Sequence, residues 1–74
     1  MSRRRDPLST LTPREIDVLS LMAAGRSNQA IADALHIVLG SVEKHSTSLF
    51  AKLGLDTDST SHRRVLAVLT WLQR

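Results

Sequence analysis

A cluster of helix-start signals near the N-terminus constrains the fold of this chain more than any other feature. Thr12 can cap a helix with its hydroxyl, Pro13 suits the first helical position because no amide hydrogen is needed there, and Glu15 can complete a capping box. Apolar residues then recur at helical spacing as far as Gly25, a residue that readily ends a helix in the left-handed conformation. The pattern predicts a helix over about residues 13–24.

The rest of the chain carries the signals of three further short helices. Ser27 is a candidate N-cap, Gly54 ends an apolar pattern with helical spacing, and a polar loop over residues 55–61 precedes a last apolar stretch. The predicted helices span about residues 28–35, 39–53 and 62–73. Because no alternation typical of a strand persists, the sequence predicts an all-α fold of four helices.

Length and charge limit what this fold can do. The 74 residues suffice for one domain, which we expect to cover residues 11–74 behind a flexible basic arm over residues 1–10. The net charge is +3, but residues 1–6 hold three arginines and one aspartate, so the remainder carries 7 basic and 6 acidic side chains. A uniformly basic surface is therefore excluded, and a nucleic acid would have to be contacted through a local cluster. The arm at Arg3–Arg5 is either a DNA contact or, as we favour, a solvated linker.

Several function classes find no support in the residues. The lack of cysteine excludes disulfides and thiolate metal sites, and His36, His45 and His62 do not have the spacing of metal ligands. No nucleophile elbow or glycine-rich phosphate loop is present, so we expect no enzyme activity and no cofactor. No apolar run approaches the roughly 20 residues that span a bilayer, and no signal peptide is recognisable, which predicts a cytoplasmic protein without a membrane partner.

The second and third predicted helices have the arrangement of a helix-turn-helix, whose second helix lies in the major groove of DNA. The outer face of this helix is polar and rich in small side chains, and Glu43, Lys44 and Thr47 could reach base edges from it. The alternative is an ordinary solvated surface, and Glu43 could equally tune the site or pair with Lys44 or a nearby arginine. Phosphate contacts are expected from the flanking side chains Ser41, His45, Ser48 and Lys52, although His45 could equally be a packing residue.

Four sequence blocks carry a family resemblance: LTPRE (residues 11–15), GRSNQAIADAL (25–35), GSVEKH (40–45) and LFAKLGL (49–55). Together they resemble the LuxR/FixJ-type, or GerE-like, C-terminal DNA-binding domain of bacterial transcription regulators, and its actinobacterial members most. The resemblance covers residues 11 to about 72. It implies a four-helix domain whose third helix reads double-stranded DNA and whose fourth often mediates dimerisation on an inverted-repeat site.

The resemblance also implies site residues by position. It assigns the base contacts to Glu43, Lys44 and Thr47. It assigns contacts with the DNA backbone to Asn28, Gln29, Ser41, His45 and Lys52. The amides at the start of the second helix suit a phosphate. Family members commonly carry a receiver or sensor domain in a longer parent chain, and work on the nucleoid in the cytoplasm. Whether this chain is an excised domain or a stand-alone regulator stays open.

Three positions depart from the family pattern. Glu43 stands where the family usually has Lys, so the preferred DNA sequence should differ. Val38 replaces the Ser or Thr that commonly caps the third helix, and a missing cap typically costs about 1 kcal/mol. Ala30 replaces the usual Glu of a second capping box, and the loop over residues 56–61 is longer than usual.

The last helix has more than one apolar stripe and is therefore under-covered in a monomer. Val65, Leu69 and Leu72 lie on one stripe. A second stripe is the predicted dimer interface, with Trp71 as either a core or an interface residue; it comprises Arg64, Ala67, Val68 and Trp71. Because a helix of about 12 residues offers only a small interface, we expect a monomer or weak homodimer in the absence of DNA.

Two other functions remain open at this point. The chain could be a protein-interaction module that pairs through its last helix with other regulators and modulates their DNA binding. Within DNA binding, it could be a promoter-recognition module like the last region of a sigma factor, which shares the LTPRE-like opening.

Overall fold

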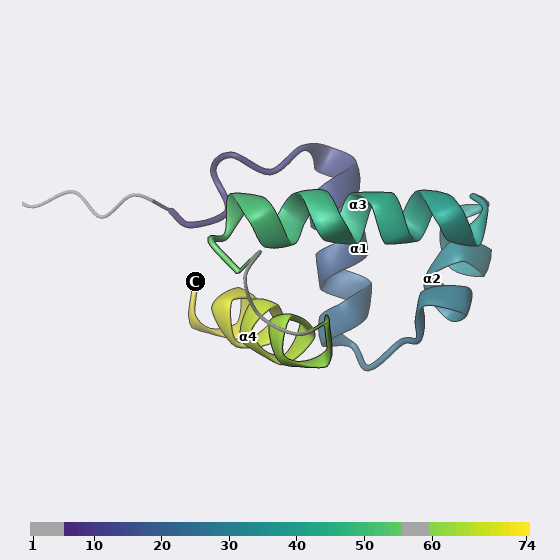
Figure 1. Ribbon diagram of the computed structural model, residues 1–74. Helices are drawn as coiled ribbons and strands as arrows, with labels where there is room; N and C mark the ends of the chain where they lie inside the picture. The colour runs from purple at the N-terminus through teal and green to yellow at the C-terminus, as the bar shows by residue number, and fades with distance from the viewer. Residues whose placement is uncertain (1–5, 56–59) are drawn as a thin grey trace, which may run out of the picture.

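The computed structural model describes residues 6–55 and 60–74, which form four helices and no strand (Figure 1). The all-α prediction is confirmed. The helices are α1 (Pro13–Ala23), α2 (Asn28–Leu35), α3 (Leu39–Lys52) and α4 (Thr60–Gln73). Only α4 differs from its predicted bounds by more than one residue, because it begins two residues earlier. The arginines Arg3–Arg5 and most of the loop over residues 56–61 lie outside the described residues.

The helix starts follow the capping chemistry of the sequence. Thr12 Oγ1 accepts a hydrogen bond from the Glu15 amide at 3.1 Å, and Glu15 Oε1 accepts one from the Thr12 amide at 2.8 Å, so the capping box is complete. Ser27 caps α2 in the same way by accepting from the Ala30 amide at 3.2 Å. The N-cap of α3 is Val38, which contributes no side-chain hydrogen bond, as predicted.

Part of the predicted flexible arm is attached to the domain. Residues 6–9 form a turn in which the Ser9 amide donates to the Asp6 carbonyl at 3.0 Å and the Leu8 amide donates to Asp6 Oδ1 at 2.9 Å. Leu8 is buried in the core beside Leu11. Within the predicted arm over residues 1–10, Leu8 is therefore packed on the domain, and residues 1–5 lie outside the described residues.

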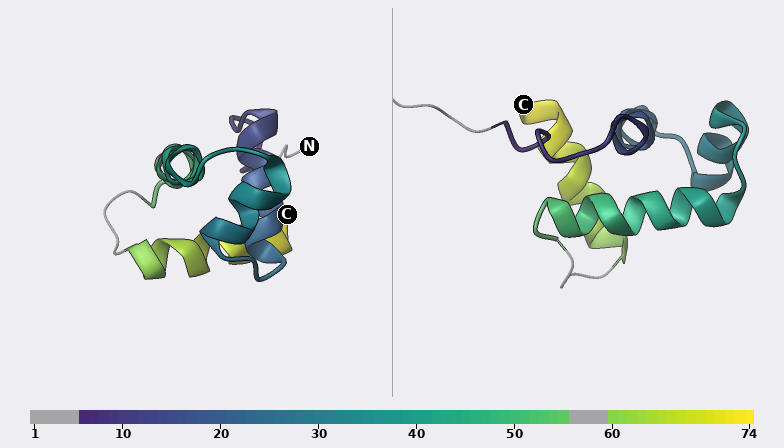
Figure 2. Two further views of the ribbon diagram at one scale, coloured as in Figure 1. Left: turned by 90° about the vertical axis from the view of Figure 1, so that its right-hand side faces the viewer. Right: turned by 90° about the horizontal axis from the view of Figure 1, so that it is seen from above.

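Helix α1 lies at the centre of the molecule and packs against the other three helices. In the view along α3, α1 and α2 lie to one side of α3 and α4 lies below it (Figure 2, left). No described helix covers the opposite side of α3. Fully buried side chains from all four helices fill the centre: Val18, Leu19, Ile31, Val42, Leu49 and Ala67.

The predicted dimer stripe of α4 is partly covered by the core. Ala67 is completely buried, and Val68 and Trp71 are partly buried against the core. The predicted dimer stripe thus faces inward, because α1 packs on this side of α4. The outward face instead carries the exposed side chains Val65 (57%), Leu69 (44%) and Leu72 (65%). No described helix has the length and apolar character needed to cross a membrane.

Candidate nucleic-acid interface

The uncovered side of α3 carries the three predicted base-contacting residues. Glu43, Lys44 and Thr47 are all exposed, whereas Val42, Ser46, Leu49 and Phe50 on the opposite side of the helix are buried. The period of the helix separates these two sets, and the apolar set ties α3 to α1 and α2. The polar face is therefore presented by a helix that is braced from behind.

The three exposed side chains offer complementary chemistry to base edges. A carboxylate at Glu43 can accept from cytosine N4, and the Lys44 ammonium can donate to guanine. The Thr47 hydroxyl donates to the Glu43 carbonyl at 3.0 Å, which leaves its oxygen as an acceptor and its methyl group for apolar contact with thymine. Because the charges of Glu43 and Lys44 are opposite, attraction to phosphates has to come from residues around this face.

The start of α2 supplies two polar side chains in different environments. Gln29 is exposed, and its Nε2 donates to Asp33 Oδ1 at 3.1 Å. Asn28 is half-buried, and its Oδ1 accepts from Arg64 Nη1 at 2.8 Å, which leaves the amide NH2 as a donor. The backbone-contact role of both residues stays a prediction.

Arg64 connects α4 to the segment that precedes α2. Its Nη1 reaches Asn28 and its Nη2 donates to the Arg26 carbonyl at 2.6 Å. These partners lie 36 and 38 residues away in the sequence, so no local pattern could reveal them. Arg64 belongs to the predicted dimer stripe, and the structure places its guanidinium at the edge of the helix-turn-helix.

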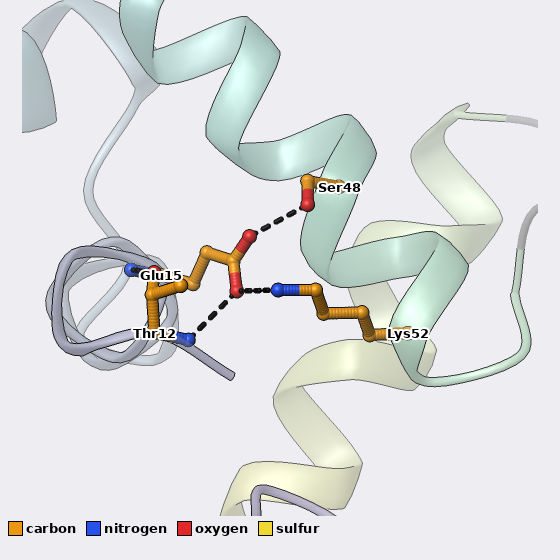
Figure 3. A network of polar contacts seen from close by, with 4 residues as sticks. All are labelled: Thr12, Glu15, Ser48 and Lys52. Atoms are coloured by element: carbon orange, nitrogen blue, oxygen red, sulfur yellow. Dashed lines mark hydrogen bonds and ion pairs between the residues drawn. The ribbon is translucent and has the colours of Figure 1, made fainter. Parts of the chain in front are cut away.

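Two predicted backbone contacts point away from the uncovered face of α3. Ser48 Oγ donates to Glu15 Oε2 at 2.6 Å, and Lys52 Nζ lies 2.8 Å from Glu15 Oε1 (Figure 3). Both side chains therefore hold α3 against α1. The polar groups of Ser48 and Lys52 are thus directed to a carboxylate on α1, and their contact with the DNA backbone stays a prediction.

Glu15 is ionised within this contact. Burial by itself would raise the pKa of Glu15, which is only 4% exposed. The hydrogen bonds from Lys52, Ser48 and the Thr12 amide outweigh burial and lower the pKa to about 2. The sequence predicts only the capping-box role of Glu15, since its partners on α3 are distant in the sequence.

Ser41 and His45 lie at the flank of α3, where both are half-buried. Their proposed phosphate contacts remain predictions. A basic residue that the sequence analysis did not assign, Arg63, lies beside this helix, with its guanidinium carbon 5.2 Å from the centre of the Phe50 ring. Arg63 and Arg64 thus bring positive charge close to Glu43 from α4.

Comparisons with known proteins agree with this arrangement. The family model GerE, described as bacterial regulatory proteins of the luxR family, matches residues 9–70. The transcriptional regulatory protein MctR of Rhizobium johnstonii is 51% identical over 47 residues, which are 64% of this chain and 22% of MctR. The oxygen regulatory protein NreC of Staphylococcus aureus is 42% identical over 50 residues, which are 68% of this chain and 23% of NreC. The chain therefore spans less than a quarter of the length of these relatives. No solved structure matches it significantly.

Proposed function

Because the chain belongs to the luxR family of bacterial regulatory proteins, we propose that it reads double-stranded DNA with the outer face of α3 in the major groove. The observation that carries this proposal is the exposure of Glu43, Lys44 and Thr47 on the uncovered side of a braced helix. The width of the groove admits one such helix, and the three side chains differ in donor and acceptor character. The actinobacterial likeness stays a prediction.

Selection of bound sequences from a random duplex pool tests this function directly. The selected duplex is then compared with a scrambled duplex at two salt concentrations. Enrichment of a defined sequence that binds more tightly than its scrambled form is the expected result. Binding that treats all sequences alike and weakens with salt would contradict base reading by α3.

Lys44→Ala is the sharpest single change on the proposed face. Lys44 is exposed, so the variant should keep its fold, but the loss of a base contact should weaken binding to the selected duplex by about 1–3 kcal/mol and relax preference at one position. Arg14→Gln is the matched control, because it removes one positive charge from α1, outside the helix-turn-helix. Fluorescence anisotropy with the selected duplex and its single-base variants measures both effects. Equal affinities for Lys44→Ala and wild type would remove Lys44 from the interface.

We further propose a homodimer through the outward face of α4. Val65, Leu69 and Leu72 are exposed, and an apolar groove of about 270 Å³ is lined by Arg64, Val65, Val68 and Leu69. Arg64 and Val68 also belong to the predicted dimer stripe, whereas Ala67 of that stripe is buried. Since α4 has only 14 residues, the dimer should be weak in solution and stabilised by an inverted repeat, on which two copies bind side by side.

The same α4 face also fits the alternative function, pairing with other regulators to modulate their DNA binding. The opposite charges of Glu43 and Lys44 favour this second candidate, because they provide no net attraction to phosphates. Failure of the duplex selection, together with association of α4 with another regulator, would support it. In either case, a receiver or sensor domain in a longer parent chain would control access to α3 or α4.

A further inference from the structure

A hollow of about 250 Å³ lies beside the outer face of α3, at the point where three helices meet. Its walls come from the start of α2, the middle of α3 and the first turns of α4: Asn28, Glu43, Ser46, Thr47, Arg63 and Arg64. Glu43 and Thr47 belong both to this hollow and to the proposed base-reading face. An occupant of the hollow would therefore lie next to the DNA interface.

The buried hydroxyl of Ser46 indicates that a ligand binds in this hollow. Ser46 is 6% exposed, and its Oγ has no hydrogen-bond partner among the residues that the structure describes. Thr47 and Thr70 satisfy their hydroxyls by donating to the carbonyl four residues earlier in their helices, which Ser46 does not do. Buried hydroxyls are nearly always paired with protein, water or a ligand.

The other polar groups around the hollow are mostly donors. Arg64 uses Nη1 and Nη2 on Asn28 Oδ1 and the Arg26 carbonyl, which orients the remaining Asn28 NH2 group as a donor. Arg63 lies against the Phe50 ring, which supports its guanidinium in the wall. Among the described residues of the lining, Glu43 is the single acidic side chain and stands against two arginines. The N-terminus of α2 adds partial positive charge on the side of Asn28.

We propose that this hollow binds a phosphate group, with the Ser46 hydroxyl, the Asn28 amide and the Arg63 guanidinium as donors. A tetrahedral oxyanion matches donors that converge from three directions, and arginine is well suited to phosphate. Two sources share this chemistry: a phosphodiester of the DNA backbone and a free phosphate or small phosphorylated molecule. For the DNA source, the inference rests on the proposed function, whereas the free-phosphate source does not.

A titration of the full chain with inorganic phosphate tests the site without DNA. The backbone amide resonances of Asn28, Ser46 and Arg64 should shift and saturate with phosphate, but not with sodium chloride of equal ionic strength. Ser46→Ala removes the hydroxyl with little change in volume and should weaken phosphate binding roughly tenfold, because a hydrogen bond to a charged group is lost. Ser20→Ala is the matched control, since the Ser20 hydroxyl donates to the Asp17 carbonyl within α1 at 2.9 Å.

Competition experiments distinguish the two sources. The DNA backbone is the ligand if two results are found. Phosphate displaces the selected duplex more strongly than sodium chloride of equal ionic strength, and Arg63→Gln lowers the slope of log K against log salt concentration by the amount expected for about one phosphate contact. If phosphate binds without displacing DNA, the ligand is a free phosphate group. The absence of saturable shifts in the wild-type chain would overturn the site. Saturable shifts in a chain that binds no DNA would overturn the proposed function and keep the site.

Discussion

At the scale of single residues, Glu15 joins a local helix start to a long-range contact. Its carboxylate accepts hydrogen bonds from the Thr12 amide, three residues earlier, and from Ser48 and Lys52, 33 and 37 residues later. The same oxygen, Oε1, accepts hydrogen bonds from both the Thr12 amide and the Lys52 ammonium (Figure 3). The negative charge is thus part of the packing between α1 and α3.

This arrangement predicts a stability loss in acid. The pKa of Glu15 is lowered from 4.5 to about 2 in the folded chain, so its contribution is fully present above pH 4.5 and is lost as the pH falls towards 2. One pKa unit corresponds to about 1.4 kcal/mol. Because the Lys52 side chain is 34% exposed and water screens the pair, we expect a contribution on the order of 2 kcal/mol. Urea unfolding followed by circular dichroism at pH 6 and pH 2.5 measures it.

Glu15→Gln isolates this contribution from that of the other carboxyl groups. The variant should be less stable than wild type at pH 6 and should lose less stability between pH 6 and pH 2.5. Asp17→Asn is the matched control, because Asp17 is exposed and only 3.7 Å from Arg14 across one helical turn. It should keep the wild-type dependence on pH. A Glu15→Gln chain with the full wild-type loss would show that the contact contributes no pH-dependent stability.

At the scale of helices, the sequence is informative wherever the determinants are local. The ends of α1, α2 and α3 are predictable to within one residue, because caps, prolines and glycines act on the next turn of the chain. The exposed set Glu43, Lys44 and Thr47 also follows from helical spacing alone. The direction of Ser48 and Lys52 does not, since it depends on how α3 crosses α1. The missing side-chain cap of α3 is a local feature as well, and its consequence can be measured.

Val38→Ser should stabilise α3. Val38 has the extended backbone conformation of an N-cap, with φ −77° and ψ 156°. Its side chain is 71% exposed, so little packing is lost on substitution. A serine hydroxyl can accept from an otherwise unsatisfied amide in the first turn, which is worth about 1 kcal/mol. Val38→Ala is the matched control, because it shortens the side chain without providing a cap. Equal urea midpoints for the two variants would contradict the capping effect.

At the scale of the whole molecule, the position of α1 decides which faces of the other helices are covered. Packing on α1 buries Ala67 and leaves Val65, Leu69 and Leu72 outside. Both stripes of α4 are apolar, so the sequence of this helix does not distinguish the core face from the outer one. Only the placement of α4 below α3 and against α1 makes the distinction (Figure 2).

Leu69→Ser should therefore weaken the dimer, whereas Ala67→Leu should lower the stability of the fold. Leu69 is 44% exposed, so its substitution should change the free energy of unfolding by no more than about 0.5 kcal/mol, but should weaken the DNA-bound dimer roughly tenfold because apolar contact is lost in both copies. Ala67 is fully buried, and a larger side chain there should destabilise the fold by about 1–3 kcal/mol through overpacking. Sedimentation on an inverted-repeat duplex measures the dimer, and urea unfolding measures the fold. A Leu69→Ser chain that dimerises on DNA like wild type would move the interface away from α4, whatever its stability.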